Sequence, residues 1–147
     1  MYRIRDGKPQ VLLAHLGGPY FKHKDEGSWT IPKGEIADGE GRLEAARREF
    51  AEELGTGVDG PFLPLTPITQ KGGKVVHAWA VEGDIDVTSI KSNTFPMEWP
   101  PRTGRTAYFP EVDRAEFFDV ETARRKINPA QVAFVDELEE LLKKRRE

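Results

Sequence analysis

The segment from Gly41 to Leu54 has the clearest periodicity in the chain, and it is followed by Gly55 as a stop signal. Its apolar residues recur at helical spacing: Leu43, Ala46, Phe50 and Leu54. We therefore expect one amphipathic helix here, with β-prone runs before and after it. An order of strands, helix, strands and helix predicts a mixed α/β or α+β fold.

The expected strands are short and bounded by turn residues. The apolar run Val11–Leu16 lies between a proline and a Gly-Gly pair, which predicts a buried strand. Residues 29–34 predict an extended edge segment, because Pro32 cannot donate to a sheet ladder. The runs 65–70 and 75–81 flank a Gly-Gly pair and predict a hairpin.

The second half of the chain is less regular. Residues 83–105 show no clear period and predict a long surface excursion. Short strands are expected at 106–109 and 115–118, followed by a small helix at 121–126. Asn128, Pro129 and Gln131 then predict the start of a last helix, with Gln131 as the partner of the N-cap.

The composition indicates one domain over residues 1–147, because 147 residues are about one domain's worth. The 22 basic and 25 acidic residues give a net charge of -3, which argues against general affinity for nucleic acid or anionic lipid. The absence of cysteine excludes disulfides, thiolate nucleophiles and cysteine-ligated metals. No apolar run is long enough for a membrane span or signal peptide, so we expect a cytoplasmic protein.

Glu49, Glu52 and Glu53 share one side of the expected helix. At about 100° per residue, Glu49 and Glu53 lie within about 40° of each other, and Glu52 lies about 60° to the other side. Like charges at this spacing repel, so we expect a cation among them. Carboxylate oxygens favour hard ions such as Mg²⁺ or Mn²⁺. Taken alone, the segment is more typical of a solvated acidic face.

The flanking residues change this interpretation. Residues 34–56 fit the pattern Gly-x5-Glu-x7-Arg-Glu-U-x-Glu-Glu-x-Gly-U, in which U is a bulky aliphatic or similar residue. The single-residue positions are matched by Gly34, Glu40, Arg48, Glu49, Glu52, Glu53 and Gly55. Phe50 is acceptable at the first U position, and Thr56 is a weak match at the second. The segment resembles the Nudix box.

The resemblance implies an α/β/α sandwich with a mixed sheet between helices. It also implies a hydrolase that cleaves a pyrophosphate bond in a nucleoside diphosphate linked to another group, such as a dinucleoside polyphosphate or a nucleoside triphosphate. The implied cofactor is Mg²⁺, for which Mn²⁺ can substitute. A catalytically silent nucleotide-binding module on the same fold is the alternative, although a sensor has no need of the intact glutamates.

Carried onto this chain, the resemblance makes Glu49 and Glu53 metal ligands, with Glu53 also among the catalytic residues. Glu52 is a further ligand or the residue that activates water. Arg48 orients the glutamates by ion pairing, and Glu40 is a weaker candidate for the metal or its surroundings. Gly34 and Gly55 serve the backbone, the first in the loop and the second at the helix end.

Residues outside the box complete the expected site. Lys33 and Arg102 are candidates for phosphate binding, and Trp29 and Tyr20 for stacking on a base. Family members often take an extra acid from outside the box, for which Glu98 and Glu111 are the candidates, with Glu98 expected among the catalytic residues. The expected partner is a small nucleotide or polyphosphate substrate, and neither nucleic acid nor a membrane is expected as a partner. The sequence leaves open whether the chain forms a homodimer.

Overall fold

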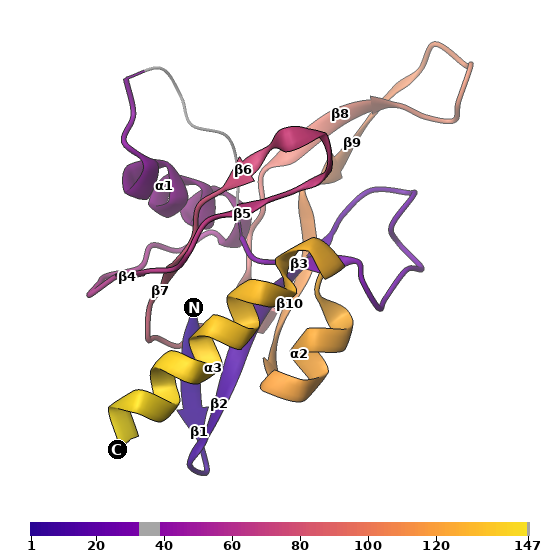
Figure 1. Cartoon of the computed structure of the whole chain (residues 1–147). Coiled ribbons are helices and arrows are strands. Elements are labelled where there is room, and N and C mark those ends of the chain that lie inside the picture. Colours follow the sequence, from indigo (N-terminus) through magenta and orange to yellow (C-terminus); the bar gives the residue numbers. More distant parts are fainter. Residues whose placement is uncertain (33–38, 147) are drawn as a thin grey trace.

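The computed structural model describes residues 1–32 and 39–146, and Figure 1 shows its arrangement. The helices are α1 (Arg42–Leu54), α2 (Val120–Lys126) and α3 (Val132–Arg146). The strands are β1 (Tyr2–Arg5), β2 (Lys8–Leu16), β3 (Trp29–Thr30), β4 (Leu63–Pro64), β5 (Ile68–Thr69), β6 (Val75–Val76), β7 (Trp79–Ala80), β8 (Thr94–Glu98), β9 (Thr106–Pro110) and β10 (Val112–Asp119).

The central sheet is built around β2, which pairs antiparallel with β1, β10 and β3. β3 pairs with β2 alone in the sheet, as expected for the edge segment that precedes Pro32. An isolated parallel bridge joins Tyr2 to Glu82, just after β7. The backbone N–H of Tyr2 donates to Val81, and that of Gly83 donates to Tyr2. The named strand pairs of this sheet are antiparallel, and the isolated bridge adds one parallel contact at the β1 edge.

The two faces of β2 bury different clusters. Val11 and Leu13 lie in a core with residues of α2 and α3, whereas Leu12 and Ala14 lie in a second core with residues of α1. Each buried Leu or Val contributes about 1.5–3 kcal/mol by leaving water. Helices thus cover both faces of the sheet (Figure 1), which confirms the α/β/α sandwich.

The helix expected over 41–54 is confirmed as α1. Phe50 and Leu54 bury its apolar side, as the spacing predicts. Gly55 ends the helix in the left-handed region, with φ of 76°, and its N–H donates to the carbonyl of Ala51. A residue without a β-carbon adopts this conformation at no steric cost, which explains the glycine.

The expected hairpin is confirmed, with β5 paired to β6 through Ile68–Val76 and Thr69–Val75. The expected strand 75–81 is broken into β6 and β7, and β7 pairs with β4. The expected surface excursion over 83–105 contains a strand that the lack of a clear period did not predict. Residues 94–98 form β8, which pairs along its length with β9. Pro96 makes this strand hard to predict, because proline has no N–H to donate to a sheet ladder.

The end of the chain follows the expectation with one correction. Helix α2 lies where it was predicted, and the Asn128 side chain accepts a hydrogen bond from the N–H of Ala130. A short 3₁₀ turn over 129–131 precedes α3. Gln131 is not the capping partner: it is fully buried, and its Oε1 accepts from the Thr30 hydroxyl and the Ile31 N–H. The side chain therefore fastens the start of α3 to β3.

None of the helices in the described part of the chain combines the length and the apolar character that a bilayer-spanning helix needs.

Candidate metal and phosphate site

Helix α1 carries the acids of the site beside its buried apolar residues. Phe50 and Leu54 anchor the helix in the core beneath β2. This anchoring turns Glu49 and Glu53 toward the junction of β9 and β10. Glu53 is itself 8% exposed, and a buried carboxylate requires a cation or hydrogen-bond donors nearby.

Arg48 lies among these acids as a bridge. Its Nε and Nη2 donate to the two oxygens of Glu40 at 2.8 and 3.1 Å, in a bidentate pair. Its Nη1 donates to Glu49 at 2.8 Å and to Glu52 at 3.0 Å. These bonds raise the pKa of Arg48 above its ordinary value. The bonds to Glu40 contribute most, followed by the bond to Glu49. The predicted role of Arg48 in orienting the glutamates is therefore supported by its contacts.

The acid from outside the box that reaches α1 is Glu111, at the junction of β9 and β10. Carboxylate oxygens of Glu49, Glu53 and Glu111 all lie within 4.8 Å of one another. The pKa of Glu111 is raised by burial and then by the charges of Glu49 and Glu52. Negative charge is thus concentrated at this point.

Glu111 is held in place through its backbone. Its N–H donates to the carbonyl of Asn93 at 2.9 Å, and its carbonyl accepts from Gly17 at 2.9 Å. Asn93 in turn donates its N–H to the carbonyl of Glu52 on α1 at 2.8 Å. Three separate segments of the chain therefore fix the distance between Glu111 and the helix.

The donor set fits a hard divalent cation. It consists of three carboxylates that surround one point, and Mg²⁺ and Mn²⁺ prefer oxygen ligands of this kind. Burial and then the charges of Glu49 and Glu52 raise the pKa of Glu111, and a bound cation would offset that repulsion. The predicted metal position agrees with this cluster, which contains Glu49 and Glu53 but not Glu52. Both Glu49 and Glu52 pair with Arg48.

The structure separates Glu98 from this cluster. Glu98 ends β8 at the far side of the hairpin, opposite Thr106, and its Oε1 accepts from the N–H of Arg102 at 2.6 Å. Its carboxylate caps the hairpin turn. Of the two candidate acids from outside the box, Glu111 is therefore the one that lies close to Glu49 and Glu53.

The predicted substrate residues have different surroundings. Trp29 is 1% exposed, packs edge to face against Phe118, and donates from its indole N–H to Asp25 at 2.9 Å. Trp29 is therefore a core residue and does not present its ring to a substrate base. Tyr20 is 56% exposed and Arg102 is exposed. Lys33 and Gly34 lie outside the described residues.

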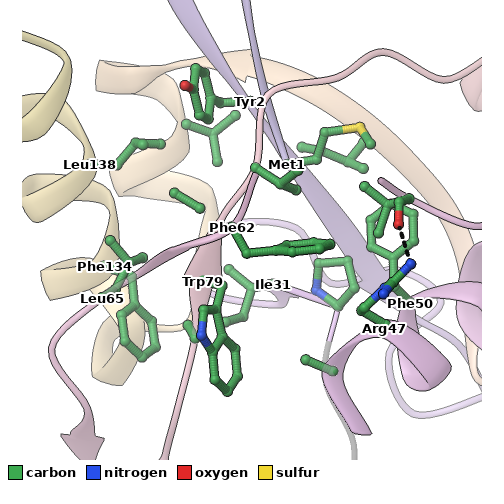
Figure 2. A pocket seen from close by; sticks show the side chains of 18 of the residues that line it. Met1, Tyr2, Ile31, Arg47, Phe50, Phe62, Leu65, Trp79, Phe134 and Leu138 are labelled. Carbon is green, nitrogen blue, oxygen red and sulfur yellow. Dashed lines mark hydrogen bonds between the residues drawn. The ribbon is translucent and has the colours of Figure 1, made fainter. Parts of the chain in front are cut away.

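A cavity of about 90 Å³ lies on the other side of α1, between this helix, the β4–β7 ribbon and α3 (Figure 2). Its walls include Phe50, Phe62, Trp79 and Phe134, and His77 is among its lining residues. None of the acids of the described cluster lines it. The cavity is therefore a mainly apolar space on the other side of the helix from the acidic cluster.

Comparison with known proteins places this arrangement in a family. The sequence model described as the NUDIX domain matches residues 1–138. A search of the curated proteins finds no match. Among solved structures, the chain is similar to the binary complex of the C. elegans Ap4A hydrolase, with a TM-score of 0.66, 20% identity, and coverage of 97% of this chain and 93% of that one. A second structure of the C. elegans Ap4A hydrolase matches with a TM-score of 0.50, 23% identity, and coverage of 97% and 88%.

At these identities the structural likeness shows the fold. The family model, however, spans nearly all of the chain, including the glutamates of α1 and Glu111. The chain therefore belongs to the NUDIX family, and the expectation that it is a pyrophosphohydrolase enzyme is confirmed.

Proposed function

We propose that this chain is a Mg²⁺-dependent pyrophosphohydrolase that cleaves a phosphoanhydride bond in a nucleoside diphosphate linked to another group. The observation that supports this most is the convergence of Glu49 and Glu53 from α1 with Glu111 from the β9–β10 junction. Carboxylates on two elements around one point suit a divalent cation that also binds substrate phosphates.

Glu49, Glu53 and Glu111 would hold the cation, with Mn²⁺ as a substitute for Mg²⁺. Once bound, the ion neutralises charge on the diphosphate and acidifies a water for in-line attack. Arg48 keeps Glu49 in position by donating a hydrogen bond to its carboxylate. Glu52, with a side chain 36% exposed, is the acid that we propose to accept the proton of the attacking water.

The first substrate to test is a dinucleoside polyphosphate. The solved structures to which the fold is similar are described as an Ap4A hydrolase. The box residues bind the diphosphate that dinucleoside polyphosphates, nucleoside triphosphates and nucleotide sugars share. A panel of these compounds, assayed with and without Mg²⁺, would identify the preferred group on the second phosphate.

The test is turnover of the panel by the wild-type chain and by Glu53→Gln. The variant removes one carboxylate charge from the cluster and keeps the shape of the side chain. We expect a loss of kcat of at least about a hundredfold, as for removal of one electrostatic stabiliser of a transition state. Glu44→Gln is the matched control, because Glu44 is an exposed acid in the first turn of the same helix.

Unchanged turnover in Glu53→Gln would overturn the assignment of the metal site. Nucleotide binding without any Mg²⁺-dependent turnover in the wild-type chain would favour the silent binding module instead. A normal rate in Glu44→Gln separates a specific loss from general damage to α1.

A further inference from the structure

The hairpin formed by β8 and β9 has two unlike faces. Along both strands, half-buried and exposed residues alternate. One face carries half-buried residues, which the register pairs as Phe95–Phe109 and Met97–Ala107. The opposite face is exposed and includes Tyr108, with 69% of its surface exposed. The hairpin projects from the rest of the molecule (Figure 1), and the residues of its apolar face are half-buried.

The apolar face leads directly to the acidic cluster. The ladder extends past both strands, because Glu111 donates its N–H to Asn93 and Trp99 donates its N–H to Arg105. Phe109 lies two residues before Glu111, where the ladder of the hairpin ends. Two residues of strand span about 7 Å. The first ring of the apolar face, that of Phe109, therefore belongs to a residue two positions from Glu111, a predicted metal ligand.

Tyr20, Trp99 and Phe109 form a row of rings on this face. The ring of Trp99 lies 5.5 Å from that of Tyr20, and the two planes make an angle of 87°. The ring of Trp99 also lies 6.5 Å from that of Phe109, again at 87°. Trp99 therefore leans back along the hairpin toward the cluster, although its backbone lies at the hairpin tip.

The loop after β2 supplies one side of this row and is fixed to the same hairpin. A β-carbon added at Gly18 would lie 3.1 Å from the ring of Phe95, so the loop backbone approaches the apolar face closely. The loop is further held by His15, whose Nε2 contacts the carbonyl of Lys24 at 2.6 Å. Tyr20 is therefore presented by an anchored loop, with its ring exposed beside Trp99.

We propose that the apolar face of the β8–β9 hairpin, with Trp99 and Tyr20 at its centre, is the stacking site for the base of the nucleotide substrate. This inference rests on the proposed function, because the diphosphate is assigned to the Glu111 cluster. A base that stacks parallel to Trp99 meets perpendicular rings edge to face, and both arrangements are favourable for aromatic groups.

A nucleotide is the occupant that matches this surface. Its anionic end belongs at the metal-binding carboxylates, and its flat aromatic end fits rings that continue from Glu111 along the hairpin. The exposed side chains of Arg102 and Arg105 lie at the hairpin tip beyond Trp99, where a second phosphate group or sugar of a longer substrate would end.

The test compares two ligands that differ only in the nucleoside. The first is α,β-methylene-ADP, whose bridging carbon resists hydrolysis, and the second is methylenediphosphonate, which has no base. Both are titrated calorimetrically with Mg²⁺ into the full chain. Stacking on one ring is worth about 1–3 kcal/mol, so Trp99→Ala should weaken binding of α,β-methylene-ADP by roughly ten- to a hundredfold. Its affinity for methylenediphosphonate should stay unchanged.

Two further variants control for folding. Trp99→Phe keeps a ring and should restore most of the affinity, and Tyr20→Ala should weaken the nucleotide analogue with no effect on methylenediphosphonate. Tyr108→Ala is the matched control, because it removes an aromatic ring from the opposite face of the same hairpin. It should leave both affinities unchanged.

The stacking site is overturned if Trp99→Ala binds the nucleotide analogue as the wild type does, or loses affinity for both ligands equally. Binding of the nucleotide analogue with undiminished affinity in the absence of Mg²⁺ would support the stacking site while counting against the proposed metal chemistry. Failure of methylenediphosphonate alone to bind would likewise count against the diphosphate site and not against the stacking of the base.

Discussion

Gly17→Ala tests whether the position of Glu111 governs activity. Gly17 lies at the end of β2, where its N–H donates to the carbonyl of Glu111. A β-carbon added there would lie 1.9 Å from the carbonyl oxygen of Pro110 and 2.9 Å from the carbonyl carbon of the same residue. The backbone of Gly17 has no positive φ, so the substitution tests steric contact alone.

The size of the expected effect follows from this contact. Real β-carbons essentially never approach another atom closer than 3.0 Å, so the two segments must separate by at least 1.1 Å. Overpacking of this kind costs about 1–3 kcal/mol of the free energy of unfolding. A misplacement of about 1 Å in a catalytic constellation costs on the order of a hundredfold in rate. We therefore expect a large loss of kcat/KM in a chain that still folds.

The assay is steady-state hydrolysis of the best substrate of the panel, together with a Mg²⁺ titration and thermal unfolding. The matched control is Gly57→Ala, because a β-carbon added at Gly57 would meet no atom within 4 Å. The reasoning is refuted if Gly17→Ala keeps the kcat/KM and the Mg²⁺ requirement of the wild type while its Tm falls by several degrees. The strain would then be absorbed without moving Glu111.

Arg48→Lys should lower kcat/KM by at least about tenfold, because an ammonium group lacks the planar fork that binds three carboxylates at once; full activity in steady-state kinetics would contradict this. The hydrogen bond from Lys126 holds the pKa of Asp25 below its usual value of 3.8, so the stabilisation is complete above about pH 4 and is lost as the pH falls through the lowered folded value. Asp25→Asn should therefore flatten the dependence of Tm on pH below about pH 4, and an unchanged slope would argue against this pair. Gly55→Ala should cost about 1 kcal/mol or more in thermal unfolding, since its φ is 76° and its β-carbon would lie 2.9 Å from Lys91. A Tm equal to that of the wild type would show that the end of α1 relaxes freely.

Local signals were sufficient for the elements that depend on local physics. The spacing of Phe50 and Leu54 predicts α1, and Gly55 predicts its end, because a helix is specified by neighbours three and four residues apart. The apolar run of β2 predicts a strand buried on both faces. Strand β8 was missed because Pro96 interrupts its pattern, and its partner β9 lies across a turn that has no hairpin signature.

The site residues likewise fall into those that local sequence predicts and those that depend on long-range packing. The box predicts Glu49 and Glu53, since both lie on one helix and their relation follows from its geometry. The choice between Glu98 and Glu111 depends on which end of a hairpin approaches α1, and that is decided by backbone bonds from Asn93 and Gly17. Trp29 was misassigned because an aromatic residue before the box is equally compatible with stacking and with a core. Its burial against Phe118 depends on long-range packing.

The division of the proposed metal ligands between two elements affects how the box should be used as a module. Grafting residues 39–55 onto another scaffold would transfer Glu49 and Glu53 but leave behind the acid that completes the cluster. The third carboxylate is supplied by a junction that Gly17 and Asn93 hold against the helix through main-chain bonds, which any sequence with the same backbone path can make. A scaffold intended to receive this helix should therefore offer a strand junction as close to the helix as the one that carries Glu111. A library that varies only the box residues would not include the third carboxylate.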